Sequence, residues 1–244
     1  MKSVIIGATA GIGRELAISL AKSGHSLLIV GKDREDVAVL KKDLFLRFSV
    51  DVTAIASDAT SLINFKAILE QEALHFGKIT NLFLPIGSSK TSDTGELGLV
   101  EVFEIINSNF LAAVIAVDVF RRYFDETGHP TIIGLSSVAA MRGRSKNIIY
   151  SASKRALESY FQSLTIQLID SNVSVQLYRL GYIDTNLSYG KRLYLPRTLP
   201  QKVSKHIINN LGKSSSTRYF PRYWRVINHI LILLPSRLFS KIKS

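Results

Sequence analysis

The chain has 244 residues, of which 46% are hydrophobic and 20% charged, a composition typical of one globular α/β domain with its own core. It contains no cysteine, which excludes disulfides and thiolate chemistry, and its five histidines form no H-x-x-x-H pair, so no metal site is expected. The apolar run at 4–6 is too short for a signal peptide. No segment is expected to offer the ~20 apolar residues of a membrane span. The expected location is the cytoplasm, with which the lack of cysteine is consistent.

Short apolar runs alternate with longer helix-like stretches along the whole chain. Runs rich in Val, Ile and Leu predict buried strands at 3–6, 26–30, 50–56, 80–86, 131–136 and 173–179, with a short last strand near 216–220. Helices are predicted at 12–23, 34–47, 61–76, 97–125 and 149–170. This alternation predicts a single doubly wound parallel sheet flanked by helices, in which ligands bind beyond the carboxyl ends of the strands.

The first loop after a strand, Gly7-Ala-Thr-Ala-Gly11-Ile-Gly13, is rich in glycine and leads into a predicted helix. Glycines allow backbone N–H groups to approach a pyrophosphate, and the positive end of a helix favours negative charge. The loop therefore predicts a dinucleotide site, with an ordinary tight turn as the alternative.

The ends of the next two strands indicate which dinucleotide is bound. An acidic residue at the second strand end binds a free ribose 2′-hydroxyl, whereas a basic one accommodates a 2′-phosphate. Strand 26–30 is followed by Gly31 and Lys32, and Asp33 is expected one step too late and solvated. NADP(H) is therefore favoured over NAD(H). Asp58, after the third strand, is expected either to hydrogen-bond the adenine or to cap helix 61–76.

Ser137, Tyr150 and Lys154 are candidate catalytic groups. Tyr150 and Lys154 are four residues apart on a predicted helix and share one face. A free tyrosine has a pKa of about 10, and a nearby ammonium is expected to lower it toward the range in which acid/base catalysis works. Ser137 would stabilise a carbonyl oxygen on which charge develops. In isolation, a Y-x-x-x-K pair is usually an ordinary helix pair.

In order and spacing, these motifs resemble those of the short-chain dehydrogenases/reductases over at least residues 3–185. The matching positions are Gly7/Gly11/Gly13, Asp58, Asn109, Ser137, Tyr150/Lys154 and the turn 180–185. The resemblance implies a Rossmann fold and hydride transfer between a nicotinamide ring and a carbonyl or alcohol. It assigns the proton transfer to Tyr150, its activation and the nicotinamide ribose to Lys154, and the substrate carbonyl to Ser137.

The resemblance also assigns a cofactor site. Asn109 would hold a proton-relay water, with Asn107 as its rival, and Thr185 would lie near the carboxamide. The cofactor-binding set would comprise Tyr150 and Lys154 together with Gly7, Thr9, Ala10, Gly11, Ile12, Gly13, Lys32, Asp58, Gly87, Gly181, Ile183 and Thr185. Residues 1–185 would form the catalytic core. Family members are commonly oligomers through helices equivalent to 97–125 and 149–170, so a homodimer or homotetramer is expected.

Three segments depart from the family pattern. Ile6 replaces the usual Thr before the first glycine, and Leu84-Pro85-Ile86-Gly87 stands where the family has NNAG. Leu180 replaces Pro before Gly181, which is expected to loosen the loop with the nicotinamide contact. None of the three alters the four catalytic positions, so catalysis is still expected.

The last quarter of the chain carries the entire formal net charge of +12, because residues 185–244 hold 12 Lys/Arg and no Asp/Glu. This asymmetry predicts an anionic partner, with a solvated basic surface as the alternative. Residues 186–244 would form a substrate loop, with Lys191, Arg192 and Arg197, and a basic amphipathic extension of the same domain. The tail 219–244 suits peripheral contact with the inner membrane surface; packing on the domain or on a second subunit is the alternative.

The tail is also similar to that of reductases of sugars on polyprenyl phosphate carriers, at Trp224, Leu234-Pro235 and Leu238-Phe239. The leading hypothesis is therefore an NADP(H)-dependent reductase of a keto-sugar, either a small molecule or lipid-linked. The alternatives are a general carbonyl or 3-ketoacyl-thioester reductase and a non-catalytic NADP(H)-binding sensor or scaffold. Nucleic acid is not an expected partner, because the motif set already accounts for the chain.

Overall fold

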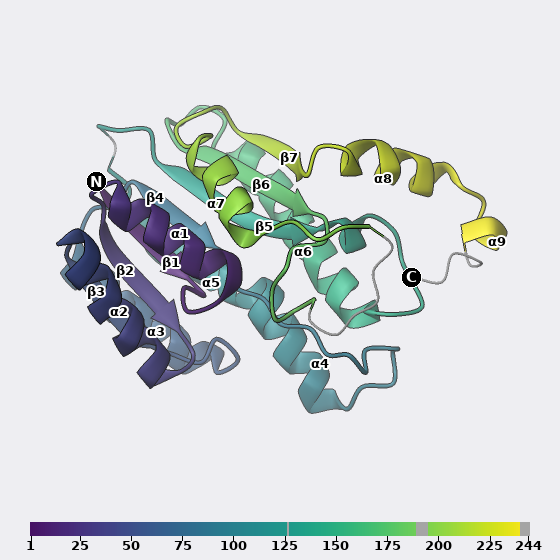
Figure 1. Ribbon diagram of the computed structural model, residues 1–244, viewed down its shortest axis with the longest axis horizontal. Helices are drawn as coiled ribbons and strands as arrows, with labels where there is room; N and C mark the ends of the chain where they lie inside the picture. Colours follow the sequence, from purple (N-terminus) through teal and green to yellow (C-terminus); the bar gives the residue numbers. More distant parts are fainter. Residues whose placement is uncertain (126, 189–194, 240–244) are drawn as a thin grey trace.

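A computed structural model describes residues 1–125, 127–188 and 195–239. Over these residues, seven strands form one parallel sheet in the order β3-β2-β1-β4-β5-β6-β7 (Figure 1). The strands are β1 (Lys2–Ile6), β2 (Ser26–Gly31), β3 (Val52–Ala56), β4 (Asn81–Leu84), β5 (Thr131–Ser137), β6 (Ser174–Leu180) and β7 (Ser216–Phe220).

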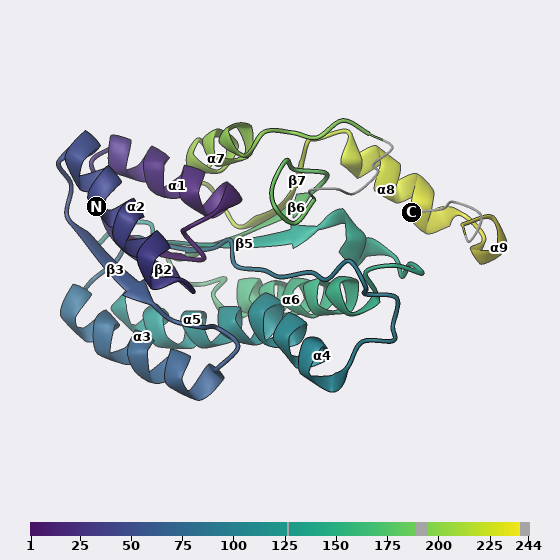
Figure 2. The ribbon, with the colours of Figure 1, turned by 60° about the horizontal axis from the view of Figure 1, so that its bottom comes forward.

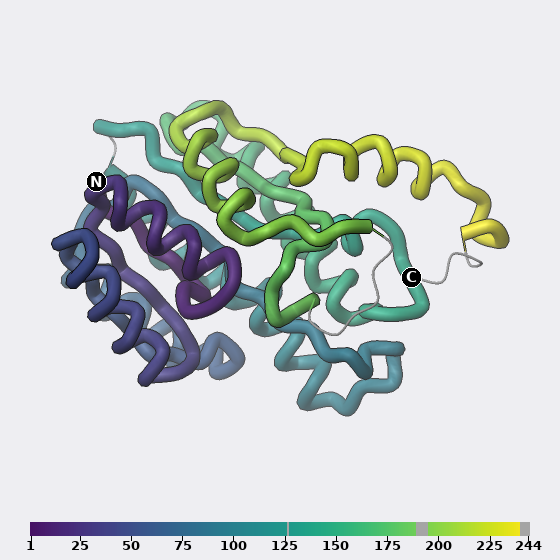
Figure 3. Tube along the Cα trace, viewed as in Figure 1, coloured from purple at the N-terminus to yellow at the C-terminus, as the bar shows by residue number. Residues whose placement is uncertain are grey.

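Helices cover both faces of this sheet (Figure 2). One face carries α1 (Gly11–Lys22), α2 (Arg34–Phe48) and α7 (Pro200–Ile208), and the other carries α3 (Leu62–Phe76), α4 (Leu99–Ile106), α5 (Ala112–Phe120) and α6 (Ile148–Gln167). The chain then continues into α8 (Trp224–Leu233) and the short α9 (Ser236–Phe239), which extend away from the body (Figure 3). The arrangement confirms the predicted doubly wound Rossmann fold.

Two hydrophobic cores form because successive side chains of a strand point to opposite faces of the sheet. Val4 and Ile6 of β1 pack with α3, α5 and α6, whereas Ile5 packs with α1, α2 and α7. All three side chains are fully buried. The central strands are therefore mostly apolar on both faces, which is the pattern that predicted them.

The binding crevice of such a fold lies where the strand order reverses, between β1 and β4. The segments that follow these two strands approach each other closely. A Cβ added to Gly7 would lie 2.9 Å from the Cα of Ile86. Pro85 follows β4 directly and has no N–H to donate, which explains why this strand ends before the predicted residue 86.

The predicted helix 97–125 is interrupted. A π-helical turn at Asn107–Leu111 separates α4 from α5, and a 3₁₀ turn at Arg121–Tyr123 follows. The segment Leu99–Tyr123 is long and apolar enough to cross a membrane by length and composition, so the expectation that no segment would be was wrong. Ala116, Val117 and Phe120 of α5 lie in the core, which accounts for the apolar character within a globular domain.

Candidate active site

The glycine-rich turn joins β1 to the N-terminus of α1. Gly7 and Gly11 have φ angles of +94° and +50°, a region that favours glycine. A Cβ on Gly13 would lie 1.9 Å from the carbonyl oxygen of Gly7, so no larger residue fits there. No described side chain caps α1, which leaves the N–H groups of its first turn available to an anion. The turn therefore fits a dinucleotide pyrophosphate.

Lys32 and Asp58 meet at the ends of β2 and β3. Their charged groups are 2.9 Å apart, and the Lys32 side chain is 76% exposed. One Asp58 oxygen accepts hydrogen bonds from the N–H and the hydroxyl of Thr60, at 2.9 and 2.8 Å. Burial alone would raise the pKa of Asp58, but the hydrogen bonds from Thr60 and Lys32 outweigh this and lower it. Lys32 is thus held at the rim of the crevice.

Two expectations about acidic residues at this end need correction. Asp33 is exposed but not merely solvated, since its carboxylate accepts hydrogen bonds from the N–H groups of Glu35 and Asp36 and caps α2. The start of α3 has Ser61 at its N-cap position and no side-chain cap, so Asp58 does not cap that helix. Its bonds to Thr60 keep it beside the crevice instead.

Ser137 and Tyr150 lie together at the carboxyl end of β5. Ser137 is the last residue of this strand, and Tyr150 lies in the first turn of α6. The Ser137 hydroxyl is near enough to the Tyr150 phenol to lower the pKa of Tyr150. The Ser137 oxygen also accepts a hydrogen bond from the Ala139 N–H at 3.1 Å. Both hydroxyl groups are therefore available to one carbonyl oxygen.

These two residues line a cleft of about 430 Å³, which we call the catalytic cleft. The glycine turn, the loop after β4 and the loop after β6 form its other walls. A Cβ added to Gly11 would lie 3.0 Å from the Thr185 side chain, so the first and last motifs of the sequence meet here. Predicted site residues in the lining are Ile12, Gly87, Ser137, Tyr150, Lys154, Gly181, Ile183 and Thr185.

Lys154 is buried on the floor of the catalytic cleft, with 4% of its surface exposed. Its ammonium donates hydrogen bonds to the carbonyl oxygens of Leu135 and Ile86, at 3.0 and 3.3 Å. Burial lowers its pKa to about 8. Burial also raises the pKa of Tyr150, and only the hydrogen bond with Ser137 opposes this rise. The groups that shift the pKa of Tyr150 here are its own burial and Ser137, and the role of Lys154 in lowering that pKa stays a prediction.

Asn109 is fully buried in the π-helical turn that interrupts the long helix. Its amide oxygen accepts a hydrogen bond from the Ser88 N–H at 2.9 Å, and its amide nitrogen donates to the Ser88 carbonyl at 2.8 Å. A Cβ on Gly87 would lie 2.8 Å from this amide oxygen and 3.1 Å from the Lys154 ammonium. Its rival Asn107 donates instead to the Thr60 carbonyl, toward the Asp58 end. Through its two hydrogen bonds with Ser88, Asn109 thus holds the loop after β4 next to Lys154.

Asp93 is a site residue that the sequence did not reveal. Its two carboxylate oxygens accept hydrogen bonds from the N–H groups of Ile149 and Tyr150, at 3.0 and 2.9 Å, and it is 1% exposed. A carboxylate at the start of α6 satisfies orphan N–H groups and complements the helix dipole. Capping residues are normally sought next to the helix, whereas Asp93 precedes Ile149 by 56 residues. Asp93 therefore ties the loop after β4 to the helix that carries Tyr150.

Two further cations line the catalytic cleft, Arg144 and Lys146, both in the loop between β5 and α6. The Nε of Arg144 is buried and has no hydrogen-bond partner among the described residues. The described lining includes no carboxylate. Of the cations predicted in the substrate loop, Arg197 lies 3.5 Å from Asp184, while Lys191 and Arg192 lie outside the described residues. The sequence signal for Arg144 and Lys146 was their place between Ser137 and Tyr150.

The start of α8 supports the loop after β6. A Cβ on Gly181 would lie 1.8 Å from the Nε1 of Trp224, so the indole packs directly on this glycine. The Trp224 and Tyr182 rings meet edge to face, with centroids 5.1 Å apart. The Gly181 N–H donates to the Phe220 carbonyl at 2.9 Å. These contacts hold a loop that was expected to be loosened by Leu180 in place of proline.

The sequence pattern of the short chain dehydrogenases matches residues 2–193. The chain belongs to this family. It is therefore an oxidoreductase that acts on the CH–OH/C=O pair, and the site described above occupies the matched part of the chain.

Known relatives are similar over most of this short-chain dehydrogenase. An uncharacterized oxidoreductase of Staphylococcus epidermidis is 25% identical over 77% of this chain and 80% of its own length. The 11-beta-hydroxysteroid dehydrogenase-like 4A of Arabidopsis thaliana is 25% identical over 98% of this chain and 83% of its own.

Solved structures share the fold. A short-chain dehydrogenase from Sphingobium yanoikuyae in complex with NADPH has a TM-score of 0.82 and 21% identity, covering 100% of this chain and 96% of that one. L-sorbose reductase from Gluconobacter frateurii, complexed with NADPH and L-sorbose, has a TM-score of 0.79 and 20% identity, covering 89% of this chain and 93% of that one.

Replacing Lys154 with methionine is expected to change how stability depends on pH. The folded pKa of about 8 lies below the ordinary value of 10.5, so the unfolded chain holds more protons between these two values. The free energy of unfolding should rise by up to about 3 kcal/mol as the pH increases through this window in the wild type, but not in Lys154→Met. The variant should thus be the more stable protein below pH 8, and its advantage in free energy of unfolding should shrink toward pH 10.5.

Urea denaturation between pH 8 and pH 10.5 measures this difference in stability, with Lys66→Met on the exposed side of α3 as the control. An advantage that does not change with pH would contradict the buried ammonium.

Proposed function

We propose that this protein is an NADP(H)-dependent carbonyl reductase with Tyr150 as the proton donor. The observation that carries the proposal is the meeting of the glycine turn, Ser137, Tyr150 and Lys154 in one cleft. A non-catalytic cofactor-binding protein would not need a hydroxyl pair beside a buried ammonium.

The proposed cofactor lies with its pyrophosphate on the glycine turn and its nicotinamide end near Gly181 and Thr185. When bound, NADPH supplies the hydride. Lys32 is the proposed contact for the 2′-phosphate, because it stands exposed at the end of β2 and no carboxylate occupies the strand-end positions Val30 and Gly31. Asp58 restrains this ammonium without burying it.

The proposed proton transfer follows from the pKa of Tyr150. A tyrosine phenol is protonated at neutral pH, and burial raises the pKa of Tyr150 further, so the proton is present to be donated. The carbonyl carbon accepts the hydride, the carbonyl oxygen accepts the Tyr150 proton, and the product is an alcohol. Ser137 donates a hydrogen bond to the same oxygen as charge develops.

The proposed substrate is a ketone that carries an anionic group, such as a keto-sugar phosphate or a keto-sugar linked to a polyprenyl phosphate. Arg144 and Lys146 support this class, because they place positive charge in the catalytic cleft and the described lining supplies no carboxylate to neutralise it. The cleft also has hydroxyl groups suited to a sugar, including those of Ser89, Thr91 and Thr94.

An NADPH-oxidation screen tests this function. It should compare keto-sugar phosphates, the corresponding neutral keto-sugars and a 3-ketoacyl thioester. We expect turnover with the phosphates, and a rise in KM of at least about tenfold for them in Arg144→Gln. Preference for the thioester would replace the proposed substrate class. Absence of turnover with every ketone, together with intact NADPH binding, would favour a sensor or scaffold.

NADPH is expected to bind at least about tenfold more tightly than NADH, because a charge-assisted contact to the 2′-phosphate is available only in NADPH. In Lys32→Ala the advantage should largely disappear, while the dissociation constant for NADH should stay nearly unchanged. Quenching of intrinsic fluorescence by each dinucleotide measures both constants. Lys22→Ala, on the far end of α1, is the control. Equal affinities in the wild type would refute the cofactor assignment.

Asp93 is a positioning residue in this proposal, and Asp93→Asn should lower kcat by about tenfold, with KM and NADPH affinity within about twofold of wild type. The amide can accept from only one of the two N–H groups at the start of α6, so Tyr150 loses its fixed orientation. Asp33→Ala, which removes the side-chain cap of α2, is the control. Both variants should lose about 1 kcal/mol of stability, but only Asp93→Asn should lose turnover. Equal kcat values in the two variants would contradict this role.

The basic tail is proposed to contact the inner surface of an anionic membrane while the body stays in the cytoplasm. Val226, Ile230 and Leu233 form an exposed apolar stripe along α8, and Arg222 and Arg225 lie beside it. The Arg142 guanidinium donates to the carbonyl oxygens of Leu231 and Leu234, which holds the end of this helix. Flotation with phosphatidylglycerol vesicles tests the contact, and protein that stays at the bottom of the gradient would contradict it.

A homodimer or homotetramer is also proposed, through α4, α5 and α6. Exposed apolar side chains on these helices support it, among them Leu99, Val100 and Phe103 of α4 and Ile166 near the end of α6. Light scattering should give two or four times the chain mass of 27.1 kDa. A monomer at micromolar concentration would refute it.

A further inference from the structure

A second cleft lies at the free edge of the sheet, beside β7. It has a volume of about 720 Å³ and is bounded by α7, β7 and α8. Within the described chain, β7 is the last strand of the sheet, and no residue lines both this cleft and the catalytic cleft. We call it the cationic cleft after six side chains in its wall: Arg179, His206, Arg218, Arg222, Arg225 and His229.

Carboxylates do not neutralise the positive charge of this cleft. Its described wall contains no Asp or Glu. Arg179 is paired with Glu158 through two hydrogen bonds of 3.0 and 2.8 Å, which use both oxygens of that carboxylate. In the part of the chain that the structure describes, no other ion pair reaches Arg218, Arg222 or Arg225. Three full positive charges therefore share one concave surface.

Two residues of the cleft are left in an unfavourable state: Arg218 has a buried donor without a partner, and His206 has a lowered pKa. The Nη1 of Arg218 is buried without a hydrogen-bond partner among the described residues, while Nη2 donates to the Ser214 carbonyl at 3.3 Å. Burial lowers the pKa of His206, and the charges of Arg222, Arg218 and Lys213 lower it further. An anion in the cleft would give the buried donor a partner and would offset the positive charges around the imidazole.

Phosphate is the anion that suits such a wall. Guanidinium groups present planar pairs of N–H donors that match two phosphate oxygens, and three arginines suit a group with more than one negative charge. We propose that the cationic cleft binds a phosphate-bearing ligand at a site separate from the catalytic cleft. A second copy of the chain does not suit this surface, because two such clefts face to face would bring like charges together.

Binding of inorganic pyrophosphate to the full-length protein tests the proposal by two readouts, calorimetry and the pKa of His206 measured by NMR. We expect saturable binding and an upward shift of the His206 pKa in its presence. Arg222→Gln/Arg225→Gln, which changes two exposed side chains on or beside α8, should weaken binding by at least about tenfold.

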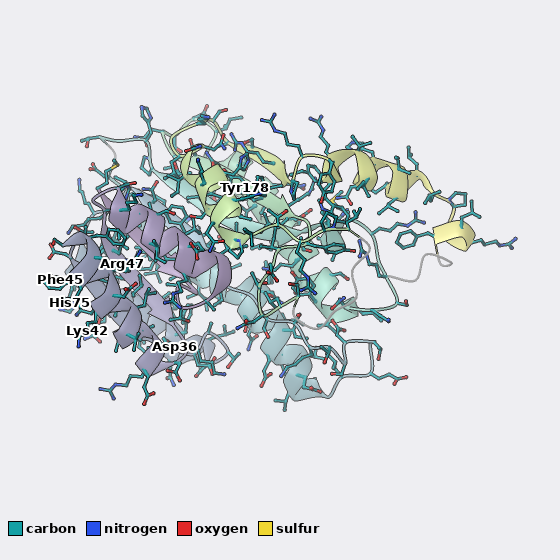
Figure 4. All side chains as sticks on the ribbon, viewed as in Figure 1. Asp36, Lys42, Phe45, Arg47, His75 and Tyr178 are labelled. Atoms are coloured by element: carbon teal, nitrogen blue, oxygen red, sulfur yellow. The ribbon has the colours of Figure 1, made fainter. Side chains whose placement is uncertain are left out.

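The matched control is Lys41→Gln/Lys42→Gln on α2, which also removes two positive charges, but near the opposite edge of the sheet. Figure 4 labels Lys42 on that helix and Tyr178 beneath α7, next to the cationic cleft. The control should bind pyrophosphate like the wild type. Equal weakening in both double variants would reduce the effect to net charge and overturn the proposal.

Binding to vesicles distinguishes the two possible sources of the phosphate group, a lipid headgroup and a soluble phosphate compound. Cosedimentation with phosphatidylglycerol vesicles but not phosphatidylcholine vesicles, lost in Arg218→Gln as well as in Arg222→Gln/Arg225→Gln, would assign the site to a lipid headgroup, because Arg218 lies in the cleft wall on β7 and not beside the apolar stripe of α8. Pyrophosphate binding without vesicle binding would assign it to a soluble phosphate. Arg218→Gln should reproduce the loss independently. Failure of both probes to bind would overturn the proposal. None of these readouts requires turnover, so they stand apart from the proposed catalytic function.

Discussion

Replacing Tyr150 with phenylalanine is expected to lower kcat by about 10³-fold while NADPH affinity stays within about twofold of wild type. The substitution removes one oxygen, the phenol hydroxyl that lies beside Ser137 in the catalytic cleft. The ring keeps its volume at the start of α6, so the cleft and its cofactor-binding wall should keep their shape. Steady-state turnover and dinucleotide titration on the same preparation measure the two effects separately.

Tyr182→Phe is the matched control for this variant. Tyr182 also lines the catalytic cleft, but it follows β6 and its ring packs on Trp224. Its kcat should stay within about threefold of wild type, because a hydroxyl without an acid/base role contributes only a hydrogen bond. General acid catalysis contributes a rate increase of at least about 10²-fold. A Tyr150→Phe enzyme that keeps a tenth or more of the wild-type kcat would therefore exclude Tyr150 as the proton donor.

Replacing Gly13 with alanine is expected to raise the dissociation constant for NADPH by at least about tenfold and to lower the free energy of unfolding by about 1–3 kcal/mol. The added methyl would lie 1.9 Å from the Gly7 carbonyl oxygen, closer than two unbonded atoms can approach. The first turn of α1 must then move away from β1, and its N–H groups leave the positions that fit a pyrophosphate. Dinucleotide titration and thermal denaturation give the two quantities.

Gly128→Ala provides the control for the added methyl. A Cβ there would lie 3.7 Å from the Asp125 carbonyl oxygen, an ordinary contact distance, in a loop before β5. Its stability should change by less than about 0.5 kcal/mol and its NADPH affinity should not change. NADPH binding by Gly13→Ala with wild-type affinity would mean that the cofactor does not rest on this turn.

The sequence by itself determined the sheet, the order of its strands along the chain and the main motifs of the catalytic cleft. Strands buried on both faces are mostly apolar, so the runs at 3–6 and 131–136 were identifiable without a structure. The glycine turn and the Tyr150/Lys154 pair were also identifiable, because their function depends on short spacings that are written directly in the sequence. Predictions of this kind rest on contacts between residues close together in the chain.

Only the tertiary structure decided which distant groups share an environment. The side chain that caps α6 is Asp93, which accepts a hydrogen bond from the N–H group of Ile149, 56 residues later in the chain. The burial that raises the pKa of Tyr150, and the hydrogen bonds of Lys154 with two carbonyls, depend on how α6 packs against β5 and the loop after β4. The excess charge of residues 185–244 was visible in the sequence. The meeting of three of these cations, Arg218, Arg222 and Arg225, in the cationic cleft was not visible in the sequence. Burial and charge pairing depend on groups that the fold brings together from separate elements.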